Sequence, residues 1–254
     1  MDFASALRQL SQAQKPARGV SLYARFVNRP AGRVLAATAH RAGLSPNHVT
    51  AVSALITCGA VAAIAWYPPS RTLGPCVALA LLVGFALDSA DGQLARLHRS
   101  ASPSGEWVDH VTDCAKLLGL HAAVLVSFHR HGDPSRPALL LAPLAFQFAA
   151  VLLFFGGILA EQLHRRDGAA GPGPVPPPSA VRGAALLPLD YGLLCLGFVL
   201  WGHQGLFLTV YLVLLAAHAV LLPVFLARWF RRLSPRPRTE ASGAERHEGA
   251  PDIA

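Results

Sequence analysis

The sequence Asp88-Ser-Ala-Asp91-Gly92-Gln-Leu-Ala95-Arg96 is followed, after eight further residues, by Gly105 and then by Asp109 and Asp113. Its four aspartates stand in what are otherwise two apolar segments, each long enough to cross a membrane as a helix. Carboxylates in such segments are costly and usually serve a function, so four of them at helical spacing need a counterion. A hard divalent cation is the simplest counterion for clustered oxygen donors. The pattern therefore predicts a helical membrane protein with a cation site.

The composition also indicates a membrane protein. Hydrophobic residues make up 53% of the 254-residue chain and charged residues only 14%, which is too apolar for an ordinary soluble domain. The formal net charge of +8 first suggests a nucleic-acid partner, but the basic residues flank the apolar segments. An anionic lipid surface and the excess of basic residues on cytoplasmic loops explain this charge better. We therefore expect membrane lipids, and no nucleic acid, as partners.

Six apolar segments have the length of about 20 residues that a helix needs to cross a bilayer. The breaks between them carry Gly, Pro, Asp and Ser, which are typical of turns. We therefore predict an all-α fold, namely a polytopic membrane protein with six transmembrane helices. The predicted spans are residues 47–67, 73–97, 107–129, 137–163, 183–202 and 205–229.

The distribution of arginines predicts the orientation. Basic residues crowd the N-terminal arm, the connections between spans two and three and between spans four and five, and the C-terminal end. The opposite side offers only Arg71, Arg130 and Arg136. Because cytoplasmic loops carry the excess of Arg and Lys, both termini and the aspartate-rich site are expected in the cytoplasm, which agrees with an even number of spans. The frequent Ala, Arg, Gly and Pro suggest a GC-rich bacterial genome, and hence the bacterial cell membrane.

Three parts follow along the chain. Residues 1–45 form a cytoplasmic arm, and within it residues 22–44 alternate apolar and Arg side chains, which predicts an amphipathic helix lying on the membrane interface. Residues 46–230 form the six-helix membrane domain. Residues 231–254 are rich in Pro, Glu, Arg and Ser and are predicted to be a disordered cytoplasmic tail.

The aspartates are expected to converge. Asp88 and Asp91 are three residues apart, and Asp109 and Asp113 are four apart, so each pair projects from one face of its helix. The connection at residues 98–105 is short, so the two helices must be antiparallel neighbours. All four carboxylates then meet near the cytoplasmic boundary. Two divalent ions would balance them, and such a pair of metals is the usual device for in-line displacement at phosphorus.

An ion-pair network that only ties the helices together is the structural alternative. Arg96 and Lys116 are the cations at hand, and they supply two positive charges against four negative ones. That imbalance favours a functional site, since ionisable residues inside a membrane default to function.

The pattern D-x2-D-G-x2-A-R-x8-G-x3-D-x3-D resembles the signature of the CDP-alcohol phosphotransferases, and every signature position is filled here. The resemblance extends over about residues 20–230, including the six spans and the interfacial helix. It implies transfer of a phosphatidyl group from a CDP-activated lipid (CDP-diacylglycerol) to a small polar alcohol, with release of CMP, in phospholipid biosynthesis. Together with the small residues in the spans, it also implies a homodimer.

The resemblance further assigns roles to single residues. It implies that Asp88, Asp91 and Asp109 bind divalent metal, Mg²⁺ or Mn²⁺, with two ions expected. Asp113 would lie near the metals as well and act as the base on the acceptor hydroxyl.

A second set of residues is expected along the nucleotide. The run Ser45-Pro46-Asn47-His48-Val49-Thr50 resembles the family's motif at the start of the first span, although a helix cap with Pro in the first turn explains it as well. The expected CDP-binding residues are Gly92, Ala95, Arg96, Gly105, Asn47 and Thr50.

Four more polar residues each allow a functional and a structural interpretation. Lys116 would contact an acceptor phosphate or tune Asp113, or act as a counterion within the helix. Arg165 and Arg166 would hold a phosphorylated acceptor or anchor the protein at the membrane surface. Asp190 would line the acceptor pocket, or form an interhelical hydrogen bond or a helix end.

Two other functions stay open at this point. A related enzyme would use a soluble CDP-alcohol as donor and a membrane lipid alcohol as acceptor, with the same CDP contacts. An ion transporter or channel would also carry carboxylates inside the membrane. In a transporter, however, the acids should be spread through the bilayer rather than gathered at one boundary.

Overall fold

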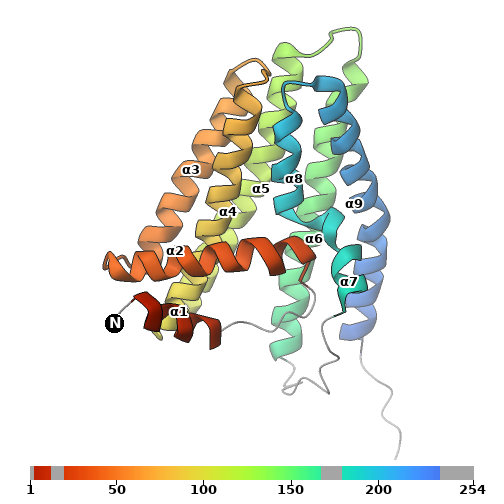
Figure 1. Ribbon diagram of the computed structural model, residues 1–254. Helices are drawn as coiled ribbons and strands as arrows, with labels where there is room; N and C mark the ends of the chain where they lie inside the picture. Colours follow the sequence, from red (N-terminus) through yellow and green to blue (C-terminus); the bar gives the residue numbers. More distant parts are fainter. Residues whose placement is uncertain (1–2, 13–19, 167–178, 235–254) are drawn as a thin grey trace, which may run out of the picture.

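The computed structural model describes residues 3–12, 20–166 and 179–234, and within these ranges all regular structure is helical (Figure 1). The elements are α1 (Phe3–Gln12), η1 (Ala24–Asn28), α2 (Arg29–Arg41), α3 (Pro46–Trp66), α4 (Leu73–Leu97), α5 (Pro103–His131), η2 (Pro137–Leu140), α6 (Leu141–Arg166), α7 (Ala180–Ala185), η3 (Leu187–Leu189), α8 (Tyr191–Gly197), η4 (Phe198–Leu200) and α9 (Gln204–Leu233).

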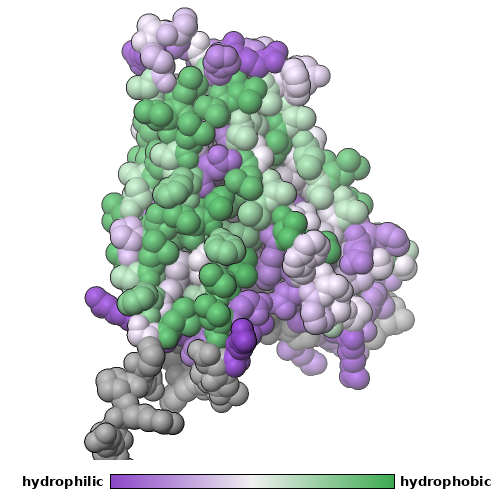
Figure 2. All heavy atoms as spheres, turned by 180° about the vertical axis from the view of Figure 1, so that it is seen from behind, coloured by the Kyte–Doolittle hydropathy of each residue, from purple (hydrophilic) through white to green (hydrophobic). Residues whose placement is uncertain are grey.

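The bundle confirms the all-α polytopic architecture. Five helices (α3, α4, α5, α6 with η2, and α9) are long and apolar enough to cross a membrane, and a bent pair of shorter segments is a sixth candidate span. Figure 2 shows one face of this bundle, which is largely apolar along its length and polar at its ends. Exposed apolar side chains of this kind, such as Leu55 at 74% and Val220 at 67% exposure, suit contact with lipid rather than water.

The predicted fifth span, residues 183–202, is not the one continuous helix that the sequence had led us to expect. The segments Gly183–Leu189 and Tyr191–Leu200 meet at an angle of 55° at Asp190. The Asp190 carboxylate caps the second segment by accepting a hydrogen bond from the Gly192 backbone N–H at 2.7 Å, and it accepts a second one from the Ser21 hydroxyl. Asp190 is therefore both a helix end and a tertiary link, which agrees with the structural readings of this residue.

The predicted interfacial helix is present as η1 and α2, and it runs across the bundle in front of α4 (Figure 1). A Cβ atom on Gly32 would come within 2.7 Å of Ser89 Oγ and 2.9 Å of Gln93 Nε2, so this glycine lets the two helices touch. The Gln93 side chain donates a hydrogen bond to the Arg29 carbonyl at 3.2 Å. The additional helix α1, which the sequence did not predict, buries Leu10 in the cluster below α2.

Two apolar clusters hold the bundle together, and the aspartates lie between them. The larger one gathers the ends of the spans away from α2, and its largest buried side chains are Trp201, Tyr211, Phe146 and Phe198. The smaller one joins α1 and α2 to Val49, Ala90 and Leu94 at the other end of α3 and α4. The predicted tail begins within α9, which ends at Leu233, and its residues 235–254 lie outside the described part of the chain.

Helices α2 and α4 end in the same motif but with different residues. After α2, Gly43 has a φ of +69°, and the Leu44 N–H donates to the Ala39 carbonyl at 3.0 Å. After α4, Arg99 takes the same left-handed conformation with a φ of 52°, and the Ser100 N–H donates to Ala95 at 2.9 Å. Glycine is the residue that adopts this conformation without steric cost.

We therefore predict that Arg99→Gly stabilises the protein by about 1 kcal/mol, the approximate cost of a left-handed L-residue. Gly43→Ala is the matched control, because a Cβ there meets no atom within 4 Å but is held at a positive φ. It should lower stability by a similar amount. Thermal unfolding in detergent measures both changes, and a lowered midpoint for Arg99→Gly would contradict this account.

A histidine pair joins the two helix ends. His40 Nδ1 lies 2.9 Å from His98 Nε2, so one ring donates and the other accepts. Desolvation, followed by the nearby His98 ring, lowers the pKa of His40 from its ordinary value. The folded protein thus holds His40 neutral at a pH where the unfolded chain binds a proton.

We predict that this contribution to stability is complete above pH ~6.5, the ordinary pKa of histidine, and is lost as the pH falls below it. Midpoints of thermal unfolding between about pH 8 and 5.5 measure the effect. In His40→Gln the fall at low pH should be shallower, because the group that takes up the proton is missing. An identical pH profile in both proteins would show that the pair does not contribute.

Candidate active site

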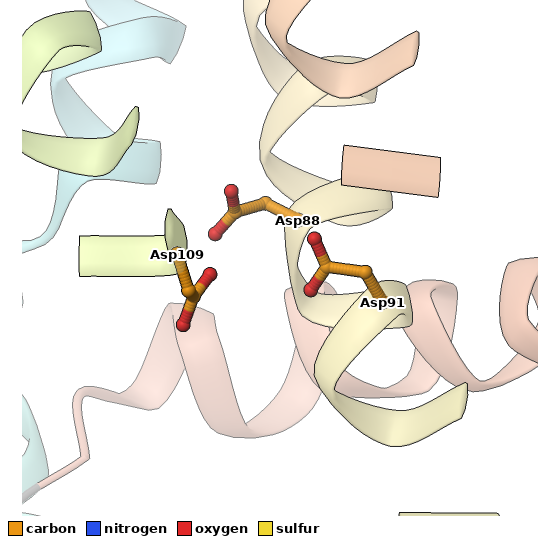
Figure 3. Close-up of side chains that lie close together, drawn as sticks. All are labelled: Asp88, Asp91 and Asp109. Carbon is orange, nitrogen blue, oxygen red and sulfur yellow. The ribbon is translucent and has the colours of Figure 1, made fainter. Parts of the chain in front are cut away.

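Three carboxylates from two helices converge at one point. Asp88 and Asp91 project from α4, Asp109 projects from α5, and their side chains point toward one another (Figure 3). One carboxylate oxygen of each lies within 4.8 Å of the others. Asp91 is buried, with 4% of its surface exposed, while the other two are partly exposed. These three residues form the aspartate triad.

Local sequence signals place the triad. The α4–α5 connection is short, as predicted, and α5 starts at Pro103 after Ser102, whose hydroxyl accepts a hydrogen bond from the Gly105 N–H at 3.1 Å. This tight reversal makes α4 and α5 antiparallel neighbours. The three-residue spacing on α4 then sets two carboxylates against the first turns of α5.

The donor set of the triad fits a hard divalent cation. All three groups offer carboxylate oxygens, which Mg²⁺ and Mn²⁺ prefer. Two ligands of one Mg²⁺ lie at most about 4.2 Å apart, twice the usual bond length. The separation of up to 4.8 Å therefore suits one ion after a small side-chain rotation, or two ions that share the carboxylates.

Asp113 lies outside the triad, against Lys116. The Lys116 ammonium donates to Asp88, to Asp113 Oδ1 at 3.4 Å and to Ser53 Oγ at 3.1 Å. The Ser53 hydroxyl in turn donates a hydrogen bond to the Gly84 carbonyl at 2.8 Å. All three ammonium protons thus have acceptors, so Lys116 is a counterion between the two acids. The metal contact predicted for Asp113 stays a prediction.

The short motif at the start of α3 serves both as a cap and as part of the site. The Ser45 hydroxyl accepts from the His48 N–H at 3.3 Å and Pro46 occupies the first turn, as a helix cap requires. One turn later, the Thr50 hydroxyl donates to Asp91 Oδ2 at 2.5 Å. Thr50 is thereby placed on the triad, whereas Asn47 is exposed in the first turn.

Gly92, one of the predicted CDP-binding residues of α4, leaves open space next to Arg96. A Cβ on Gly92 would meet only Arg96 Nη1, at 3.6 Å, within 4 Å, so the protein itself does not require glycine there. The Nε atom of Arg96 is buried without a hydrogen-bond partner. Ala95 and Gly105 are partly buried nearby in the chain. The contacts of these four residues with a nucleotide stay predictions.

The interfacial helix also carries an arginine with a buried, unpartnered side-chain nitrogen. The Nε atom of Arg33 on α2 is buried without a hydrogen-bond partner, like that of Arg96. Nothing in the sequence could single it out, because arginines every few residues are also what a membrane-surface helix carries.

A cavity of about 360 Å³ opens directly beside the acids. Asp88, Asp113 and Lys116 form one part of its wall. The remaining wall is apolar over its larger share, and it also contains polar groups. The apolar side chains include Phe85, Leu117, Phe146, Leu153, Phe154 and Leu194, and the polar ones are Thr57, His121, Asp190, Tyr191 and His218.

Among the other polar candidates, Arg165 and Asp190 already have polar partners within the protein. Arg165 lies 2.5 Å from Glu161 and 3.5 Å from Glu106 in exposed ion pairs, and Arg166 is exposed next to it. Their positions at the end of α6 agree with a surface anchor. Asp190 does line the cavity, although its carboxylate already accepts two hydrogen bonds.

The sequence model of one family, described as CDP-alcohol phosphatidyltransferase, matches residues 44–222, well over half of the chain. No curated protein matches the sequence. The family match covers α3 to most of α9 and includes the triad, Asp113 and the cavity.

We predict that Asp91→Ala weakens Mn²⁺ binding by at least about tenfold, since a buried ligand is removed from the donor set. Electron paramagnetic resonance of Mn²⁺ titrated into purified protein measures the loss. Asp133→Ala is the control, because Asp133 is an exposed carboxylate in the loop between α5 and α6. Equal Mn²⁺ affinity in the wild type and Asp91→Ala would remove Asp91 from the metal site.

Proposed function

The chain belongs to the CDP-alcohol phosphatidyltransferase family, and we propose that it transfers a phosphatidyl group from CDP-diacylglycerol to a small polar alcohol, releasing CMP. The observation that carries this proposal is the aspartate triad of α4 and α5, set beside a further aspartate at the wall of a membrane cavity. The site would face the cytoplasm of a bacterial cell, and the protein would act as a homodimer in phospholipid biosynthesis.

The triad supports a metal-assisted displacement at phosphorus. Asp88, Asp91 and Asp109 would hold Mg²⁺ or Mn²⁺, and two ions match the charge of the site best. When bound, the metal neutralises the diphosphate and stabilises charge on the leaving phosphate. The hydrogen bond from Thr50 fixes the orientation of the Asp91 carboxylate. Arg96 has a buried N–H without a partner, which suits donation to a phosphate oxygen.

Asp113 supports the acid–base part of the reaction. Its carboxylate takes the proton of the acceptor hydroxyl while the new O–P bond forms and the bond from phosphorus to CMP breaks. Lys116, at 3.4 Å, holds the Asp113 carboxylate at the wall of the cavity. Positioned bases of this kind contribute about 100- to 10,000-fold to the rate.

A second direction of transfer is supported by the apolar wall of the cavity. A soluble CDP-alcohol would then be the donor and a membrane lipid alcohol the acceptor, with the same roles for the triad and Asp113. The transporter alternative lacks such support. Helices α3 and α9 contain no acidic residue over their described lengths, so no chain of carboxylates continues across the bundle.

The first experiment follows CMP release by purified protein in lipid with CDP-diacylglycerol and a panel of alcohols. We expect release that depends on an acceptor, requires Mg²⁺ or Mn²⁺, and stops with EDTA. A parallel series with CDP-alcohols and diacylglycerol tests the second direction. The absence of metal-dependent CMP release in both series would contradict the proposed function.

We predict that Asp113→Asn lowers turnover by about 100-fold or more while donor and Mn²⁺ binding stay within about threefold, because only the base is removed. Single-turnover CMP release and donor binding measure the two effects. Asp133→Asn should behave like the wild type. A variant with unchanged turnover would exclude Asp113 as the base.

A further inference from the structure

The cavity beside the acids continues deep into the bundle along α5. Asp113, Lys116, Leu117 and His121 all line it and lie on one stripe of this helix. Asp113 and His121 are eight residues apart, which corresponds to about 12 Å along the helix axis. The deeper part thus belongs to the interior of the bundle, beyond the level of the triad.

The charges on the wall disfavour an anionic occupant for this deeper part. Lys116 lines the wall, and its ammonium already donates to two carboxylates and to Ser53. Asp88, Asp113 and Asp190 also line the cavity, so the wall is net negative. A phosphorylated acceptor would be disfavoured by this charge, whereas the phenylalanine and leucine side chains of the wall suit an apolar body.

One donor at the deep end has no partner. His121 is buried with 1% of its surface exposed, and its Nδ1 lies 2.6 Å from the hydroxyl of Tyr211. His121 Nε2 is buried and makes no hydrogen bond, although the residue lines the cavity. The Tyr211 hydroxyl is also buried, so its proton is satisfied when it is donated to Nδ1. In the neutral ring, Nε2 then carries the proton.

A buried N–H without an acceptor is unfavourable, and it becomes favourable when a ligand supplies an oxygen. The neighbours of His121 are aromatic, since its ring lies 4.4 Å from the Phe146 ring and 5.8 Å from the Tyr211 ring. The matching oxygen is therefore uncharged and is carried by an apolar body. An ester carbonyl of a glycerolipid has both properties.

We propose that this cavity binds the glycerolipid moiety of a substrate and that His121 Nε2 donates a hydrogen bond to one of its ester carbonyl oxygens. The proposal rests on the proposed function, which brings a lipid and a water-soluble substrate together at Asp113. His121 is then a specificity-determining residue for the lipid. The glycerolipid comes from the donor if CDP-diacylglycerol is used, and from the acceptor if a lipid alcohol is used.

The test compares ester lipids with ether lipids that lack the carbonyl. One arm uses CDP-diacylglycerol and CDP-dialkylglycerol with the polar alcohols, and the other uses diacylglycerol and dialkylglycerol with CDP-alcohols. The arm that releases CMP identifies the source of the lipid. The wild type should have a KM for the ester lipid about 3- to 10-fold below that for the ether lipid, as expected for one hydrogen bond.

The informative variant is His121→Leu combined with Tyr211→Phe, because removing the whole pair leaves no unpaired hydroxyl behind. It should raise the KM of the ester lipid to that of the ether lipid and leave the KM of the water-soluble substrate unchanged. Tyr211→Phe alone keeps the imidazole and should keep the preference for the ester.

Two outcomes would overturn the proposal: equal KM values for both lipids in the wild type, or an equal rise for both lipids in the double variant, which would mark His121 as a packing residue only. Native mass spectrometry of diacylglycerol and dialkylglycerol retained by the purified protein gives the same comparison without turnover. If neither arm releases CMP, the proposed function fails while this binding test still decides the role of His121.

Discussion

The structure depends on keeping carboxylates inside an apolar helical bundle. Acids at membrane depth are costly unless they are paired or bind a cation. The protein meets part of this requirement itself, because Lys116 lies against Asp88 and Asp113 and the Thr50 hydroxyl donates to Asp91. Two apolar clusters lie on either side of the acids and fix α4 and α5 against their neighbours. The polar layer thus lies between two packed apolar layers.

The N-terminal arm is tied into this layer rather than merely resting on the membrane. Ser21 donates to Asp190, the residue at which the fifth span bends, and Asp190 lines the cavity. Tyr23 packs so closely on Gly192 that a Cβ there would approach its ring to 2.0 Å. The arm therefore sets the position of one wall of the cavity. Its helix α2 also packs on α4 next to the triad. The arm therefore contacts both the cavity wall and the helix that carries two of the triad aspartates.

The sequence predicted the parts of this structure that depend on spacing. Helical periodicity and a short connection were sufficient to bring Asp88, Asp91 and Asp109 together, and apolar length was sufficient for the spans. The break at Asp190 had a local signal in Pro188, which cannot continue a helix, but the apolar length of residues 183–202 outweighed it. The contact of Asp190 with Ser21, 169 residues away, had no signal in the sequence. Likewise, no local signal distinguishes Arg33 from a surface anchor.

The pairing of His121 with Tyr211 could not be predicted from the sequence either, because the two residues are 90 positions apart. Given this fold, α5 presents an ordered series along one stripe: the triad aspartate Asp109, the proposed base Asp113, the counterion Lys116 and then the side-chain donor His121. The series spans about 18 Å of helix and changes from charged to apolar with depth. A phospholipid precursor changes in the same direction, from its diphosphate through its esters to its chains. A single helix can therefore match the polarity of such a substrate along its length.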